Sequence, residues 1–99
     1  MNVSIDERLF EWDDEKAEVN WQKHRVRFET AARVFSDDAH IIEFDDEHSD
    51  YEDRWKVIGK VDDILFVIYT ERGEFTRLIS ARKATASERR KYYAGTQNY

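Results

Sequence analysis

The sequence predicts an α+β fold, in which a compact antiparallel β-sheet carries two N-terminal helices on one face and is followed by a C-terminal helix. Two patterns predict it. Apolar residues in the first part of the chain recur at helical spacing, whereas from residue 41 onward short apolar runs are separated by polar turns. A chain of 99 residues with 40% hydrophobic content suits one domain with a modest core. We therefore expect a single domain over residues 1–99.

The N-terminal part predicts a short strand and two helices. Leu9, Phe10 and Trp12 indicate the strand, and Asp13 or Asp14 can cap a helix that runs to about His24. This helix has an apolar stripe and a polar neighbour, formed by Ala17, Trp21 and His24 and by Lys16, Asn20 and Lys23. The second, shorter helix has an apolar face formed by Phe28, Ala31, Ala32 and Phe35.

The second half predicts four strands and a last helix. The strands are expected at 41–44, 54–60, 64–70 and 74–82, and short polar turns join the last three as antiparallel hairpins. Strand 64–70 is apolar on consecutive residues, which is typical of a central strand covered on both faces. In the last strand we expect Phe75, Ile79 and Ala81 to face the helices, and the opposite face to hold Thr76, Leu78, Ser80 and Arg82. Thr85 or Ser87 is expected to cap the final helix.

The charge is unevenly distributed along the chain. The net charge is −6, yet residues 72–93 hold seven Lys and Arg against two Glu, a local net charge of +5. Clustered Lys and Arg displace counterions from nucleic acids, so this segment could bind a phosphate polymer. The alternative is a short surface helix with a solvated, charged face.

Composition limits the environment of the protein. There is no cysteine, so neither disulfides nor thiolate chemistry are available. The N-terminus has no apolar signal region, and the longest apolar run, residues 64–69, is too short to span a bilayer. We expect a cytoplasmic protein without a membrane partner.

Three stretches of the chain carry a family resemblance. Residues 12–35, 54–59 and 68–93 resemble the BrnT family of bacterial ribonuclease toxins along nearly the whole chain. In the first block the matching residues are Trp12, Asp13, Lys16, Asn20, Lys23, His24, Val26, Phe28 and Ala31. In the late block they are Thr70, Arg72, Gly73, Arg77, Ile79, Ser80, Ala81, Arg82, Ala84, Glu88, Arg89 and Tyr92.

The resemblance implies a RelE-like fold with an RNA site on one face of the sheet. It implies an endoribonuclease toxin of a type II toxin–antitoxin module, neutralised by a cognate BrnA-like antitoxin. Operator DNA would be contacted only indirectly, through that antitoxin. No cofactor or metal is expected. The alternative is a catalytically inactive binding or regulatory subunit that keeps the fold and the antitoxin surface.

RNA cleavage through the 2′-hydroxyl needs a proton acceptor, cations for the phosphate and a proton donor. The candidate catalytic residues are His24, Lys23, Arg72, Arg82 and Ser80, and the candidate RNA-binding residues are Arg77, Lys83, Arg89, Arg90 and Tyr92. Each has a structural alternative. His24 could cap its helix, Arg82 could pair with Glu88, and Tyr92 could be a packing residue.

The chain departs from the family pattern at two arginines. Arg25 stands where the family has glycine after the histidine, and Arg27 stands where it often has a small residue. Arg25 must therefore adopt a strained left-handed conformation or end the helix differently, which affects the orientation of Lys23 and His24. Both arginines also add positive charge beside the expected site.

Segment 44–53 is rich in acidic residues. Asp45, Asp46, Glu47, His48 and Asp50 are possible metal ligands. Their spacing lacks the alternation and the turn glycine of a calcium loop, so we interpret the segment as a mobile, solvated loop between strands. Such a loop could repel RNA from the wrong face or contact a basic partner.

Overall fold

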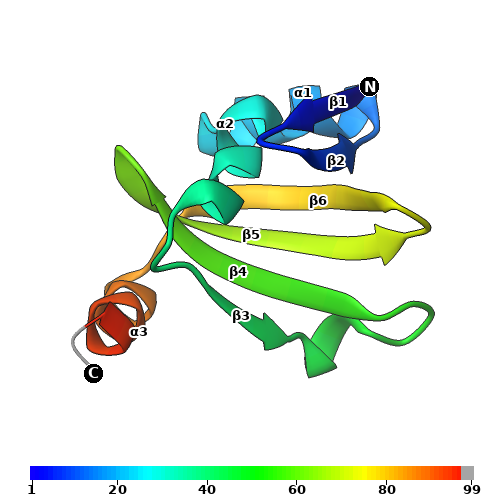
Figure 1. Cartoon of the computed structure of the whole chain (residues 1–99). Coiled ribbons are helices and arrows are strands. Elements are labelled where there is room, and N and C mark those ends of the chain that lie inside the picture. Colours follow the sequence, from blue (N-terminus) through cyan, green and yellow to red (C-terminus); the bar gives the residue numbers. More distant parts are fainter. Residues whose placement is uncertain (97–99) are drawn as a thin grey trace.

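The computed structural model of the chain describes residues 1–96 (Figure 1). Within them the α+β fold predicted from the sequence is confirmed. The elements are β1 (Asn2–Ile5), β2 (Arg8–Glu11), α1 (Asp14–His24), α2 (Phe28–Ala32), the 3₁₀ turn η1 (Arg33–Ser36), β3 (Ile41–Phe44), the 3₁₀ turn η2 (Asp46–His48), β4 (Arg54–Val61), β5 (Asp63–Arg72), β6 (Phe75–Lys83) and α3 (Ala86–Thr96).

The strands form a six-stranded sheet in the order β1-β2-β6-β5-β4-β3. Neighbouring strands are antiparallel except for β2 and β6, which run parallel through the pairs Phe10↔Thr76 and Glu11↔Arg77. The sheet is therefore mixed, because the first hairpin joins the edge of the last strand. This places the first hairpin beside the last strand in one sheet (Figure 1).

One face of the sheet carries the main hydrophobic core. Val57, Val67 and Leu78 project from β4, β5 and β6 and pack with Phe28 and Val34, which come from α2 and η1. Gly59 makes this close approach possible, since a Cβ atom there would lie 2.8 Å from the Cβ of Val34. The helices α2 and η1 therefore close this face of the sheet.

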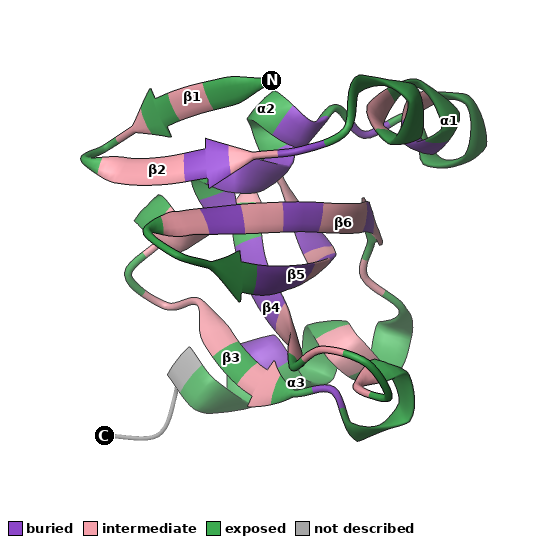
Figure 2. Cartoon of the chain, turned by 90° about the vertical axis from the view of Figure 1, so that its right-hand side faces the viewer, coloured by how far each residue is buried: buried purple, intermediate pink, exposed green. Residues whose placement is uncertain are grey.

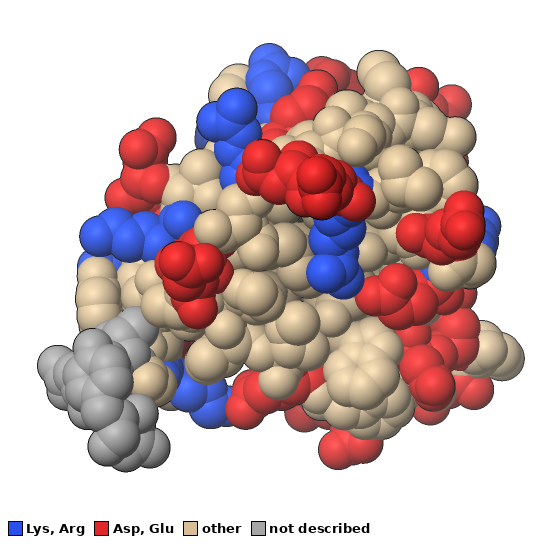
Figure 3. Space-filling model, viewed as in Figure 1, with Lys and Arg blue, Asp and Glu red and all other residues tan. Residues whose placement is uncertain are grey.

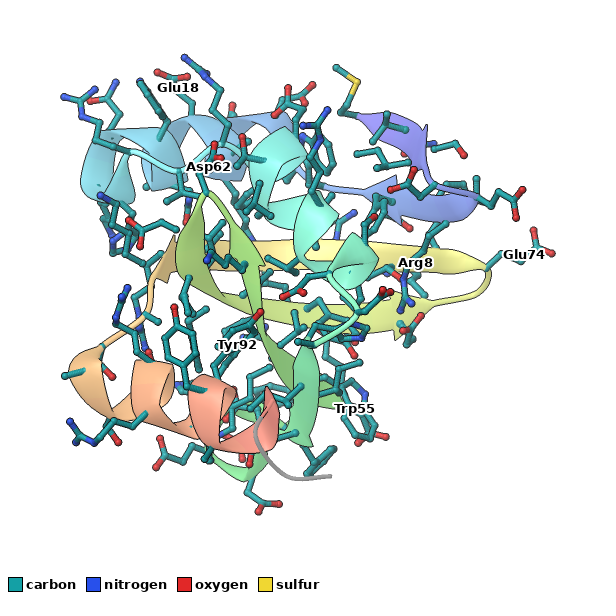
Figure 4. The ribbon with its side chains drawn as sticks, turned by 60° about the vertical axis from the view of Figure 1, so that its left-hand side comes forward. Arg8, Glu18, Trp55, Asp62, Glu74 and Tyr92 are labelled. Carbon is teal, nitrogen blue, oxygen red and sulfur yellow. The ribbon has the colours of Figure 1, made fainter. Side chains whose placement is uncertain are left out.

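The opposite face has a smaller core at one end. Ile58 and Ile64 pack with Tyr92 of α3, whose ring points from the helix towards the sheet (Figure 4). The Tyr92 hydroxyl donates to Asp37 Oδ2 at 2.6 Å, and the Lys60 N–H donates to the same oxygen at 2.8 Å. This shared acceptor ties α3 to β4. The helix covers only one end of the face.

A β-bulge corrects the expected orientation of β6. Ile68 pairs with Ser80 whereas Tyr69 pairs with Leu78, so Ile79 is an extra residue in the strand. The alternation therefore changes phase at this point, as the burial along β6 shows (Figure 2). Thr76 and Leu78 are buried on the main-core face, and Phe75 and Ile79 lie on the opposite face, the reverse of our expectation. Beyond the bulge the expected sides are found, with Ala81 in the core and Ser80 and Arg82 opposite.

None of the helices within residues 1–96 combines the length and the apolar composition needed to cross a bilayer.

Candidate functional site

The side chain of Asn20 fixes α1 along the edge of β6. Its amide nitrogen donates to the carbonyl oxygens of Val26 and Ala81, both at 2.9 Å, and the Ala81 N–H donates to Asn20 Oδ1 at 3.0 Å. Asn20 therefore makes the hydrogen bonds to the backbone of β6 that a neighbouring strand would make, at a point beyond the pairing of β2 with β6. This attachment brings the last turn of α1 beside Ser80.

A groove of about 340 Å³ lies between α1 and β6. It is lined by Glu15, Lys16, Val19, Asn20, Lys23, His24, Ile79 and Ser80. The structure thus brings together three of the residues predicted for the site, namely Lys23, His24 and Ser80. Lys23 and His24 are exposed at the end of the helix, where a substrate could reach them.

Arg25 ends α1 in the left-handed conformation, with φ 56° and ψ 34°. Its N–H donates to the Trp21 carbonyl at 2.9 Å, so the helix ends as it would with glycine, although a side chain is present. The guanidinium carbons of Arg25 and Arg27 lie 5.4 and 4.1 Å from the centre of the Trp21 ring. Both arginines therefore place positive charge around Trp21, near Lys23 and His24.

A second groove, of about 440 Å³, crosses the part of the sheet that α3 leaves uncovered. We call it the open-face groove; it is lined by Asp45, Glu47, His48, Arg54, Lys56, Phe66, Ile68, Ile79, Ser80, Arg82 and Glu88. It shares Ile79 and Ser80 with the groove beside α1. The two grooves therefore adjoin one another at β6.

Two basic residues of this groove, Arg54 and Lys56, were missed in the sequence analysis. Lys56 pairs with Ile68, which pairs with Ser80, so these three side chains form one row across β4, β5 and β6. Lys56 makes no ion pair with any residue in 1–96. The alternation Arg54, Trp55, Lys56 would have predicted a basic strand face.

The acidic segment 44–53 includes the 3₁₀ turn η2 and is joined to the sheet by hydrogen bonds. The Ser49 hydroxyl donates to the Asp45 carbonyl at 2.6 Å, and the Thr70 hydroxyl donates to the Asp53 carbonyl at 2.6 Å. Asp45 is buried, and its Oδ2 lies 2.9 Å from His48 Nδ1. The segment lies on the same face as Lys56 and Arg82. Within residues 1–96 no three His, Asp or Glu side chains are grouped so as to hold a metal ion.

Arg82 forms a two-pronged ion pair with Glu88. The distances are 2.8 Å from Nη1 to Oε1 and 3.0 Å from Nη2 to Oε2, and the guanidinium lies 4.1 Å from the centre of the Phe66 ring. Glu88 also accepts from the Thr85 N–H at 2.8 Å, while its own N–H donates to the Thr85 hydroxyl, so Thr85 caps α3 as predicted. Burial raises the pKa of Glu88, but the hydrogen bonds from Arg82 and Thr85 outweigh it and lower the pKa overall.

The other basic residues predicted to bind RNA are mostly paired with acidic residues. The pairs are Arg77 with Glu11 at 2.7 Å, Lys83 and Arg89 with Asp63 at 3.4 and 3.2 Å, and Lys91 with Glu43 at 2.8 Å. Arg90 has no ion-pair partner among residues 1–96. Acidic and basic side chains alternate on the face drawn in Figure 3. The basic stretch is therefore not one continuous patch.

Arg72 and Tyr92 also lie outside the two grooves. Arg72 is four residues beyond Ile68 on β5, about 13 Å along the strand at the usual rise, and its Nη2 lies 4.0 Å from Glu52 Oε1. Tyr92 is buried, and burial together with its hydrogen bond to Asp37 raises its pKa to about 12. Its ring is not available to stack on a base, so we assign Tyr92 a packing role.

A further cavity, of about 580 Å³, lies away from these grooves. Asp6, Glu7 and Asp38 line it together with Arg8. The Arg8 guanidinium lies over the Phe35 ring at 4.1 Å and bonds to Thr76 and Glu71. Its acidic lining makes this cavity a poor site for a polyanion.

The fold and the grooves define a small α+β protein whose two adjoining grooves are lined by lysine, arginine and histidine side chains. The family model that describes the ribonuclease toxin BrnT of type II toxin–antitoxin systems matches residues 12–88. The chain therefore belongs to the BrnT family, as the sequence resemblance predicted.

The structure is also similar to the 1.1 Å crystal structure of the Brucella abortus ribonuclease toxin BrnT. The two chains are 25% identical, the match covers 77% of this chain and 95% of that one, and the TM-score is 0.58. A comparison with curated proteins gave no match.

Proposed function

We propose that this protein is a metal-independent endoribonuclease toxin that binds RNA across the open-face groove and the adjoining groove beside α1. Besides the family membership, the observation that carries the proposal is the row formed by Lys56, Ile68 and Ser80, which ends beside Lys23 and His24. A polynucleotide lying across the strands would meet cations on β4, β6 and α1. Such an arrangement suits a phosphate backbone.

The chemistry follows from the residue types along this path. His24 is a candidate proton donor or acceptor, and Lys23 can assist it or bind a phosphate. Arg82 would offer a planar fork of donors to the phosphate in exchange for Glu88, and Ser80 can donate a hydrogen bond. Arg72 would contact the RNA backbone farther along β5. These groups provide proton transfer and charge stabilisation, so the reaction calls for no cofactor.

The decisive experiment uses the purified protein in EDTA with single-stranded RNA and with DNA of the same sequence. We expect RNA to be cut and DNA to remain intact, because only RNA has the 2′-hydroxyl nucleophile. Strict dependence on Mg²⁺ would contradict the proposed mechanism. If free RNA remains intact while ribosome-bound message is cut, the enzyme acts only on the ribosome.

The partner in this proposal is a BrnA-like antitoxin that neutralises the toxin in the cytoplasm and connects it to operator DNA. The alternative, a catalytically inactive subunit that keeps the antitoxin surface, is favoured by one observation. Arg82 is fully engaged with Glu88, and four further cations are paired with carboxylates. Absence of cleavage in every assay, together with a stable antitoxin complex, would support this alternative.

A further inference from the structure

His48 differs from the other two histidines in what holds its ring. Its Nδ1 lies 2.9 Å from Oδ2 of Asp45. His24 has no hydrogen-bond partner among residues 1–96, and Nδ1 of His40 contacts the Asp37 carbonyl while its ring packs edge-on against Phe35. Within the described chain, His48 is therefore the histidine with a carboxylate partner.

The two members of this pair differ sharply in exposure. The Asp45 side chain is 6% exposed, whereas the His48 side chain is 60% exposed. A histidine that only tethers a loop stabilises the fold most when its ring is packed against other side chains. The His48 ring is largely exposed instead. A buried carboxylate that accepts from Nδ1–H fixes the tautomer in which Nε2 is a free proton acceptor.

The backbone around Asp45 is firmly held, which fixes the direction of the ring. The Asp45 N–H donates to the Arg54 carbonyl at 2.9 Å, and the Arg54 N–H donates to the Ser49 hydroxyl at 3.0 Å. Both contacts join the loop to the first residue of β4. His48 is therefore positioned by the sheet and not by a free loop.

The surroundings of His48 suit a phosphate. His48 lines the open-face groove together with Lys56, Arg82 and Ser80. Lys56 and Arg82 project from β4 and β6 on either side of Phe66 and Ile68. A phosphodiester in the groove would lie among these cations, and the oriented imidazole of His48 lines the same groove.

We propose that His48 is the general base of RNA cleavage and that Asp45 is its positioning residue. The assignment rests on the proposed ribonuclease function. His48 Nε2 takes the proton of the 2′-hydroxyl, and the 2′ oxygen forms a bond to phosphorus. The bond from phosphorus to the 5′ oxygen breaks, and its electron pair stays on that oxygen, which takes a proton from the Lys56 ammonium. The products are a 2′,3′-cyclic phosphate and a 5′-hydroxyl. In this assignment His48 takes the proton-transfer role for which His24 was a candidate, and His24 binds the flanking RNA backbone beside α1.

The test measures cleavage of single-stranded RNA by His48→Gly with and without added imidazole, and by His48→Gln. We expect both variants to bind RNA as the parent does and to lose about 100- to 10,000-fold in kcat, the usual range for one acid or base. Imidazole should restore part of the activity of His48→Gly. Substitution by glutamine keeps a hydrogen-bond donor for Asp45, so loss of the fold would not explain its defect.

Asp45→Asn provides the second arm, and Asp46→Asn provides the matched control, because Asp46 is exposed and the change in charge is the same. Asp45→Asn should lower kcat with little change in KM, whereas Asp46→Asn should cut RNA as the parent does. Parent-like cleavage by folded His48→Gln would overturn the assignment while leaving the proposed function intact. Absence of cleavage by the parent protein would instead refute the proposed function itself.

Discussion

Arg82 combines a structural role with a proposed catalytic one. Its guanidinium bridges β6 and the first turn of α3 through Glu88, and it also covers the Phe66 ring. Glu88 is at the same time the reciprocal partner of the Thr85 cap. A phosphate that recruits Arg82 must therefore compete with a carboxylate that also holds the start of the helix.

We therefore predict that Arg82→Ala lowers both stability and cleavage. Loss of hydrogen bonds to a charged group costs about 1.5–3 kcal/mol, which for a domain of this size lowers Tm by roughly 4–8 °C per kcal/mol. Loss of a transition-state charge contact lowers kcat by about 100- to 1,000-fold. Thermal melting and cleavage assays measure the two effects. The control Arg82→Lys keeps the positive charge but cannot form the two-pronged ion pair. An unchanged Tm for Arg82→Ala would show that the ion pair with Glu88 contributes nothing to stability.

Arg25 is the residue at which the backbone conformation and the side chain conflict. A left-handed conformation costs an ordinary residue about 1–2 kcal/mol, and glycine adopts it freely. Arg25→Gly should therefore raise the free energy of unfolding by about 0.5–1 kcal/mol, measured by urea denaturation. Arg27→Gly is the matched control, since Arg27 has φ −85° and lies just before α2. A lower stability for Arg25→Gly would mean that its contact with Trp21 outweighs the strain.

At the scale of elements, the attachment of α1 depends on one side chain. Asn20 satisfies three backbone groups, two of them on Ala81 at the edge of β6. Asn20→Ala would leave these buried groups without partners, at about 1–3 kcal/mol for each group that water cannot reach. We expect a loss of about 2–4 kcal/mol in the free energy of unfolding, and weaker cleavage as Lys23 and His24 leave Ser80. Gln22→Ala, on the exposed face of α1, should change neither quantity. Unchanged stability of Asn20→Ala would refute this role.

The attachment of α3 predicts a response to alkaline pH. The folded-state pKa of Tyr92 is raised to about 12 from an ordinary value of 10.0, first by burial and then by Asp37. The group therefore contributes stability fully below pH 10, and this contribution is lost as the pH rises to 12. Tyr92→Phe should lose the hydrogen bond at pH 7, about 1 kcal/mol, and should show a smaller further loss between pH 10 and 12. Urea denaturation between pH 10 and 12 measures the free energy of unfolding of both proteins. An equal loss of this free energy in the two proteins would contradict the prediction. Tyr69, whose pKa is also raised to about 12 by burial, contributes to the pH dependence of stability of both proteins in this range.

Most elements could be predicted from the sequence because local signals agree with the fold. Apolar spacing marks α1 and α2, polar turns separate β4, β5 and β6, and Thr85 with Glu88 marks the start of α3. The strand β1 was missed. Its turn has Asp6 and Glu7 at φ 50° and 69°, where glycine or asparagine is the usual signal. The bulge at Ile79 could not be predicted either, because it depends on the register with β5.

The site was only partly predictable, for physical reasons. The residues of α1 and β6 that line the grooves were identified by their chemistry and the family pattern. The partners of the basic residues were not, because Glu11, Glu43 and Asp63 come from other parts of the chain. Lys56 carries a visible alternation signal, whereas the pairing of His48 with Asp45 depends on the burial of a carboxylate in a segment that reads as a loop.

At the scale of the whole molecule, the basic late segment does not act as one surface. Alternate residues of β6 point to different faces, and α3 directs Arg89 and Lys91 towards acidic residues of β5 and β3. The cations left without carboxylate partners in residues 1–96 include Lys56 and Lys23, which lie along the two adjoining grooves. The net charge of −6 is therefore compatible with the proposed path for RNA across the sheet.

The most direct test of this path is the rate of RNA cleavage in EDTA by Lys56→Glu compared with Arg33→Glu. The two variants have the same net charge, but Arg33 is exposed on η1, against the other face of the sheet. We predict that Lys56→Glu loses at least about 100-fold in cleavage rate, as expected for a lost charge contact in the transition state, while Arg33→Glu stays within about threefold of the parent. Equal losses in the two variants would contradict the account, because net charge alone would then explain RNA binding and the open-face groove would not be the site of cleavage.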